Sequence, residues 1–214
     1  MVNTDAALSR TERLRRLTAG QHAALERVSG LPGSLRSRAD LLHVLVTFHG
    51  FIAPLEPMLR DAQDWHAIGL PQVAGGRCAR LRADLHGLGL SAADIAALPL
   101  HPSPPACETP AAAWGIAYVL EGSTMGGRLM SRHLAAHPDP TMPAHSHHFD
   151  AYGARTGACW RAFRSGLDAL VLEEGREASL ETAARDSFTR LADWFEQRFA
   201  PRQGPASRAS PVTE

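Results

Sequence analysis

The segment from Trp114 to Arg128 constrains the fold most, because it has the pattern of a helix and carries glycines where a helix normally carries side chains. Gly115, Gly122 and Gly126 are separated by seven and four residues, which places them on or beside one line of an α-helix. A glycine inside a helix costs about 1 kcal/mol relative to alanine, so this clustering implies a compensating close approach to the backbone. A second helix and a flat or bulky ligand both meet that requirement, and the spacing does not choose between them.

A membrane-spanning helix is not expected in this segment. Small residues four apart, such as Gly122 and Gly126, are common where helices pack tightly in membranes. However, Glu121 and Arg128 interrupt the apolar run. A span requires about 20 predominantly apolar residues, and we expect no part of this chain to meet that requirement.

The chain as a whole is predicted to be all-α, with short proline- or glycine-containing connections and no alternating strand pattern. A capping box of Ser9 and Glu12 is expected to begin the first helix, and Thr109 is expected to cap the glycine-bearing one. Pro54 and Pro57 should bend or end the first of the remaining helices. These helices are expected over residues 37–59, 77–88, 91–98, 146–172 and 179–199.

Length and composition favour one well-cored domain. The 214 residues are 44% hydrophobic and show no internal repeat. We assign residues 1–200 to this domain and expect 201–214 to be a disordered tail. The formal net charge is zero, which removes any argument for bulk electrostatic attraction to nucleic acid.

The cysteines favour a reducing compartment. Cys78, Cys107 and Cys159 are odd in number and widely spaced, so we interpret them as free thiols. Charged residues at 11–16 occupy the place where a secretory signal would need an apolar core. A cytoplasmic location is therefore expected.

A second informative segment runs from Leu14 to Glu26 and has helical periodicity. His22 lies at the edge of its apolar face. A lone histidine in such a place is more often a half-buried residue with its hydrogen bonds satisfied than a metal ligand. Glu26 nevertheless lies one turn further on, where its carboxylate can accept the imidazole proton and leave the other ring nitrogen for a metal.

Together these two segments resemble heme oxygenase, specifically the bacterial branch that supplies bile pigments or releases iron from heme. The pattern Leu-Arg-x-x-Thr-x-x-x-His-x-x-Leu-Glu at 14–26 is similar to the first helix of that family. Tyr-Val-Leu-Glu-Gly-Ser-Thr-Met-Gly-Gly at 118–127 is similar to its distal helix. The order and separation of the two motifs also agree, and the resemblance covers residues 8 to 200 approximately.

The resemblance implies a single-domain helical bundle in which heme lies between the first, proximal helix and the glycine-bearing distal helix. Heme would be both substrate and oxygen-activating cofactor. His22 would be the proximal ligand of the heme iron, with Glu26 fixing its tautomer. The backbone at Gly122 and Gly126 would crowd the opposite face and direct bound oxygen toward one meso carbon. Ser123 would help to hold a proton-delivering water chain, and the products would be biliverdin, carbon monoxide and ferrous iron.

Heme-propionate contacts must differ from those of lysine-containing members, because all 22 basic residues of this chain are arginine. Arg15, seven residues before His22, is the best candidate near the proximal histidine. The resemblance suggests Arg161 or Arg164 as a second contact, with solvated surface charge as the alternative. Tyr118 and Gly127 are further expected heme contacts.

The distal helix also departs from the mammalian-type members, which carry an aspartate where this chain has Ser123. Bacterial members that carry the sequence Glu-Gly-Ser generally function without that aspartate. We therefore expect this chain to be active, with protons delivered by another route. The chain has no flavin or nicotinamide motif, so an external electron donor is expected, such as a ferredoxin, a flavodoxin or a reductase. A biliverdin-accepting photoreceptor is a further candidate partner.

Two other functions fit the same sequence. A heme carrier or sensor would bind heme through His22 and leave it intact. Another enzyme on this helical scaffold, such as a di-iron oxygenase or a thiamin-related hydrolase, is the second alternative. The di-iron version requires Glu-x-x-His motifs, and no such tetrapeptide occurs in the chain.

Overall fold

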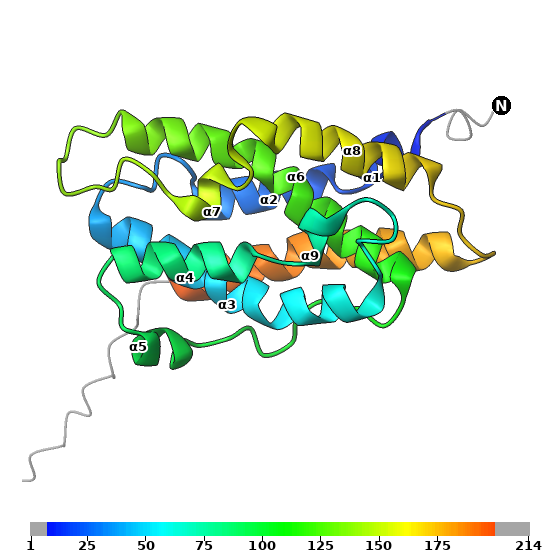
Figure 1. The fold of residues 1–214 in the computed structure, drawn as a ribbon, viewed down its shortest axis with the longest axis horizontal. Coiled ribbons are helices and arrows are strands. Elements are labelled where there is room, and N and C mark those ends of the chain that lie inside the picture. Colours follow the sequence, from blue (N-terminus) through cyan, green and yellow to red (C-terminus); the bar gives the residue numbers. More distant parts are fainter. Residues whose placement is uncertain (1–7, 200–214) are drawn as a thin grey trace, which may run out of the picture.

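The computed structural model describes residues 8–199, which form an all-α fold with no strand among them, as predicted (Figure 1). The tail expected over 201–214 lies outside the described residues. The α-helices are α1 (Arg10–Leu17), α2 (Ala19–Ser29), α3 (Arg38–Ala62), α4 (Arg77–Gly87), α5 (Ala92–Ala96), α6 (Pro110–Ala135), α7 (His147–Asp150), α8 (Thr156–Ala169) and α9 (Arg176–Phe199). Short 3-10 turns cover Pro71–Ala74 and Gly153–Arg155.

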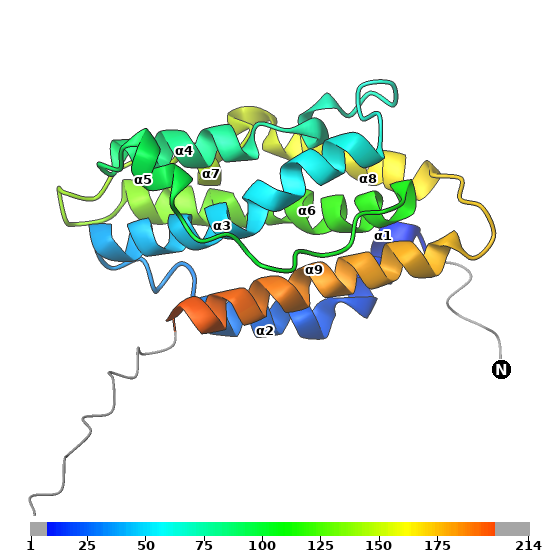
Figure 2. The ribbon, with the colours of Figure 1, turned by 90° about the horizontal axis from the view of Figure 1, so that it is seen from below.

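The glycine-bearing helix α6 lies at the centre of the bundle. It packs against α9 along much of its length, and against α3, α7 and α8 on its other sides. Helix α2 packs on α9, and Figure 2 shows these two helices together forming the layer below α3 and α6. Helix α9 thus supports both α2 and α6, the helices that carry the two sequence motifs.

The first predicted helix is divided into α1 and α2. The capping box of Ser9 and Glu12 begins α1 as predicted. The break falls at Thr18, whose backbone has φ −101° and ψ 2°. Its hydroxyl donates to the carbonyl oxygen of Leu14 at 2.8 Å, the kind of local bond by which threonine competes with regular helix geometry.

Helix α3 runs through Pro54 and Pro57 to Ala62, so the prolines do not end it, and Figure 2 shows it bending on the way. Pro54 has no N–H to donate to Gly50 four residues earlier. The freed carbonyl oxygen of Gly50 accepts instead from the backbone N–H of His101 at 2.9 Å. A partner from a distant loop therefore lets the helix continue.

The helix predicted over 146–172 is in fact two helices, α7 and α8. The chain leaves helical geometry at Ala151, with φ 39°, and at Gly153, with φ 56°. Helix α9 begins at Arg176, three residues before the predicted start.

Helix α3 corrects the expectation that no segment is apolar enough to span a membrane. Its length and composition would permit a span, with a mean hydropathy of 1.3 over its most apolar window. Half of that window is buried within the fold, where α3 packs on α4, α6 and α9. Burial in the core accounts for this composition.

Candidate functional site

The glycines of α6 fall into two groups according to what their missing Cβ atoms would meet. A Cβ at Gly115 would clash with the carbonyl oxygen of Leu180 in α9, and one at Gly127 would clash with that of Phe149 in α7. These two glycines allow close helix packing. A Cβ at Gly122 would be in ordinary contact with the ring of Trp160, at 3.6 Å, and one at Gly126 would have no neighbour within 4 Å. Helix packing and an open surface therefore both occur, at different positions of one helix.

Gly122 and Gly126 lie on a side of α6 that also carries exposed apolar side chains. Met125 is 40% exposed and Leu129 is 47% exposed, and these two residues are one helical turn apart. We call Gly122, Met125, Gly126 and Leu129 the glycine face. Large apolar side chains exposed beside bare backbone are typical of a surface that receives a ligand.

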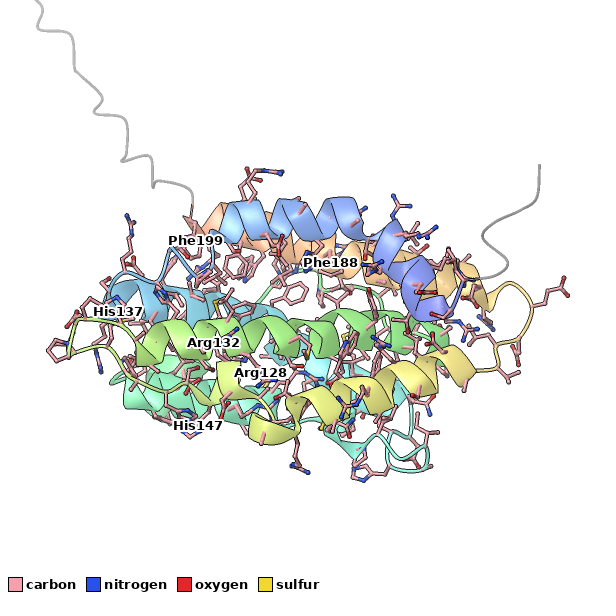
Figure 3. The ribbon with its side chains drawn as sticks, turned by 90° about the horizontal axis from the view of Figure 1, so that it is seen from above. Arg128, Arg132, His137, His147, Phe188 and Phe199 are labelled. Atoms are coloured by element: carbon pink, nitrogen blue, oxygen red, sulfur yellow. The ribbon has the colours of Figure 1, made fainter. Side chains whose placement is uncertain are left out.

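His22 lies on α2, with its side chain 55% exposed. The ring of Phe188 in α9 contacts it edge-on, with ring centroids 5.3 Å apart. Figure 3 shows Phe188 between the layer of α2 and α9 and helix α6. The Nδ1 atom of His22 is 3.6 Å from a carboxylate oxygen of Glu26, which is within ion-pair range and longer than a hydrogen bond. The other ring nitrogen, Nε2, is left for a ligand.

Tyr118 links the proximal and distal segments. Burial raises the pKa of its hydroxyl, whereas a hydrogen bond with Thr18 and the charge of Arg15 act to lower that pKa. Helices α2 and α6 run in the same direction from this contact (Figure 1). One helical turn further along each, the chain places His22 on α2 and Gly122 on α6. The predicted site residues of the two motifs thus lie on two helices that both pack against α9.

The predicted propionate contacts are exposed arginines on α1 and α8. Arg15, Arg161 and Arg164 form no ion pair with any of the described residues. Arg161 follows Trp160, whose ring touches Gly122 and lies 6.0 Å from that of Tyr118. Uncompensated guanidinium groups at this place suit the carboxylates of a heme.

Ser123 is exposed, and its hydroxyl donates to the carbonyl oxygen of Leu120 at 2.8 Å. In a helix, Ser123 projects about 100° away from Gly122. Its oxygen can still accept a hydrogen bond from water, because a hydroxyl has acceptor lone pairs beside its single donor.

Helical position aligns Met125 and Leu129 with Gly122, since they follow it by three and seven residues, but it does not show that this side of α6 is exposed. No sequence pattern links Phe188 to His22 or Trp160 to Gly122, because only the packing of α9 and α8 brings these side chains together. Among the described residues, no three His, Cys, Asp or Glu side chains are grouped to hold a metal ion, which gives the di-iron alternative no support.

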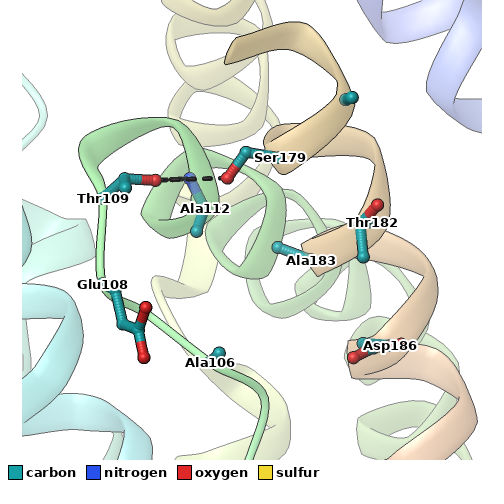
Figure 4. A pocket seen from close by; sticks show the side chains of 9 residues that line it. Ala106, Glu108, Thr109, Ala112, Ser179, Thr182, Ala183 and Asp186 are labelled. Atoms are coloured by element: carbon teal, nitrogen blue, oxygen red, sulfur yellow. Dashed lines mark hydrogen bonds between the residues drawn. The ribbon is translucent and has the colours of Figure 1, made fainter. Parts of the chain in front are cut away.

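A separate hollow of about 320 Å³ lies where the N-terminal parts of α6 and α9 meet (Figure 4). The hydroxyl groups of Thr109 and Ser179 are 3.2 Å apart there, and Thr109 also caps α6 by accepting from the N–H of Ala112. Glu108 and Asp186 make its lining acidic. The hollow includes no histidine and no residue of the glycine face, so it is not the site predicted from the motifs.

Comparison with known proteins shows the family of this chain. A sequence profile of the family described as Heme oxygenase matches residues 8–197. A protein named "Heme oxygenase" from Xanthomonas campestris pv. campestris (strain 8004) is 31% identical over 147 residues, covering 68% of this chain and 82% of that protein. "Heme oxygenase PigA" from Pseudomonas aeruginosa is 28% identical over 198 residues, covering 89% of this chain and 93% of that protein. The match extends over nearly all of the described fold, and this chain belongs to the heme oxygenase family.

Proposed function

We propose that this chain is a heme oxygenase that cleaves heme to biliverdin, carbon monoxide and ferrous iron, using dioxygen and external electrons. The observation that supports the proposal is that His22 lies exposed on α2 and the open glycine face lies on α6, two helices that both pack against α9. Membership of the family supports the same reaction. The carrier alternative is not favoured, because both relatives are named heme oxygenases.

His22 holds the heme iron through its Nε2 atom, and this requires a neutral imidazole. Glu26 accepts the proton on Nδ1, directly or through one water, and so fixes the tautomer and the ring orientation. Phe188 supports the ring from α9. Bound heme supplies the iron centre that activates dioxygen.

The glycine face would lie against the other side of the heme. There Gly122 and Gly126 would present bare backbone, and the space that their missing side chains leave would direct dioxygen chemistry toward one edge of the porphyrin. Met125 and Leu129 cover the porphyrin and exclude water. Gly127 packs against α7 and is left out of the proposed heme contacts.

The polar edge of the heme is held by arginine. Arg15, Arg161 and Arg164 bind the propionates, because a guanidinium can donate two parallel hydrogen bonds to a carboxylate. Tyr118 lies against Trp160 at the end of the site where these arginines begin. Ser123 and nearby backbone carbonyls hold the water that delivers protons, so no single side chain is indispensable for that step.

An external electron donor is needed because the sequence has no flavin or nicotinamide motif. We propose a ferredoxin, a flavodoxin or a reductase as the electron donor, a biliverdin-accepting photoreceptor as a possible product partner, and a cytoplasmic location. The buried free thiols of Cys78 and Cys107 agree with a reducing compartment.

Reductive turnover separates the enzyme from a carrier. With ascorbate or a ferredoxin-type donor, and with catalase present to remove free peroxide, the heme-loaded protein should form green biliverdin and release carbon monoxide. Ser123→Ala should slow this only several-fold, because one water-bridged hydrogen bond contributes about 1 kcal/mol. Heme that stays intact, or decays only when catalase is omitted, would favour the carrier.

A further inference from the structure

Glu121 directly precedes Gly122 and is fully buried on another side of α6. Its Oε1 atom accepts hydrogen bonds from the guanidinium of Arg77 in α4 and from the hydroxyl of Tyr152, the latter at 2.9 Å. Arg77 also donates to the carbonyl oxygen of Val73 at 3.1 Å. The cluster of Glu121, Arg77 and Tyr152 therefore joins α6 to two separate parts of the bundle.

The stability of the fold does not by itself explain this cluster. Desolvation can cost a buried ion pair as much as its attraction returns, and apolar residues of similar volume often replace such a pair without loss of stability. Burial acts to lower the pKa of Arg77, but Glu121, together with smaller contributions from Tyr152, Glu56 and Cys78, more than reverses this, so the pKa lies above its ordinary value. The pair is directional, because both bonds converge on Oε1 of Glu121, whereas Glu121 Oε2 and Arg77 Nε are buried without a partner among the described residues.

The hydrogen bonds of Glu121 affect how α6 is rotated about its own axis. Successive helix residues project about 100° apart, so a side chain fixed at Glu121 also fixes the direction of Gly122. Gly127 supplies a second constraint, because its close approach to the backbone of Phe149 holds α6 against α7. Neither constraint lies on the glycine face, which stays open.

We propose that Glu121, held by Arg77 and Tyr152, is a positioning residue that sets the rotation of α6 and thereby the distance from the backbone of Gly122 and Gly126 to bound heme. The inference rests on the proposed function, since it concerns the same site. The cluster acts from behind the helix and touches neither heme nor oxygen.

The decisive variant is the double change Arg77→Met/Glu121→Leu, which removes both buried charges together. Removing one partner alone would strand the other charge in the core and risk unfolding. The double variant should keep a thermal midpoint close to that of the wild type and bind heme through His22 with an unchanged affinity. The azide affinity of its ferric heme should change by about tenfold in either direction, because small shifts of a close backbone have large effects on groups bound beside it. The biliverdin should become a mixture of meso isomers.

Two further variants provide a weaker perturbation of the cluster and a control. Tyr152→Phe removes one hydrogen bond and no charge, and it should shift azide affinity and isomer composition in the same direction by a smaller factor. Asp186→Asn/Arg190→Gln removes an exposed ion pair within α9 and should change neither.

Unchanged azide affinity and isomer composition in a folded double variant would overturn the inference and leave the cluster a purely structural one. If the double variant does not fold, an unchanged Tyr152→Phe variant overturns it equally. Failure of the wild type to bind heme with an axial histidine would instead overturn the proposed function, and this inference with it.

Discussion

At the scale of single residues, the atoms around each glycine of α6 determine its role. Gly115 and Gly127 are surrounded by the backbone of neighbouring helices, whereas Gly126 faces open space and Gly122 touches only the ring of Trp160. The loss of a side chain allows helix packing at the first two positions. At the other two it leaves the backbone of α6 bare.

This division predicts opposite effects of the same substitution in the heme-free protein. Gly115→Ala should destabilise the fold by about 1–3 kcal/mol, because the new methyl group meets the carbonyl of Leu180. Gly126→Ala should leave stability unchanged or raise it by up to about 1 kcal/mol, because alanine favours a helix and nothing obstructs its Cβ. Urea unfolding followed by circular dichroism measures both. Equal losses at the two positions would contradict the assignment.

The predicted site residues also show what sequence reasoning can reach at this scale. His22, Gly122 and Gly126 are predicted to be site residues from the motifs and their spacing, and these assignments remain predictions. Met125 and Leu129 were missed, although their helical positions were readable, since nothing in the sequence says that this side of α6 is left uncovered. Gly127 was assigned to heme because it stands in the same motif, and only the position of α7 shows that it serves packing.

At the scale of helices, the sequence predicted which helices exist better than where they end. Periodicity and caps identified the capping box at Ser9 and the start of α6 after Thr109, and both depend on neighbouring residues alone. The continuation of α3 through Pro54 depends instead on His101, nearly fifty residues later. Such long-range partners cannot be read from local pattern.

Helix α7 shows the same dependence and gives a second prediction. Asp84 in α4 accepts from the Ser146 hydroxyl and from the N–H groups of His147 and His148, all at 2.7–2.8 Å. Asp84→Ala should therefore destabilise the protein by about 3 kcal/mol, because the start of α7 loses a charged cap. Asp61→Ala, at an exposed pair with Arg60, should cost less than about 0.5 kcal/mol. A small effect at Asp84 would show that α7 does not need this cap.

At the scale of the whole molecule, the formal net charge is zero, but the charged side chains are unevenly distributed. Arg10 and Arg13 of α1 pair with Glu177 and Glu181 of α9, which fastens α1 to the bundle. Arg15, Arg161 and Arg164 form no ion pair among the described residues. Zero net charge therefore coexists with exposed arginines that have no ion-pair partner there.

The stability of the fold should fall in mild acid. His148 packs between Phe48 and Phe149, and burial, with Arg80 and Arg77 nearby, lowers its pKa to about 3. In the unfolded chain the imidazole of His148 takes up a proton near pH 6.5, whereas in the folded protein it stays neutral until the pH approaches 3. The contribution of His148 to the free energy of unfolding is therefore complete above pH 6.5 and declines as the pH falls toward 3. Between pH 7.5 and 5 the loss from this residue should be about 1–2 kcal/mol. His148→Leu should flatten this part of the profile, whereas a matched change at exposed His66 should not; an unchanged slope in His148→Leu would contradict the assignment.

The central claim is that heme lies between α2 and α6 with His22 on its iron, and the ferric heme spectrum of His22→Ala tests it most directly. The variant should still take up heme, because the glycine face and Phe188 remain, but it should lose the absorption and spin-resonance signature of an axial histidine. Added imidazole should restore that signature, and His66→Ala should match the wild type. An unchanged spectrum in His22→Ala would place the ligand elsewhere and contradict the account.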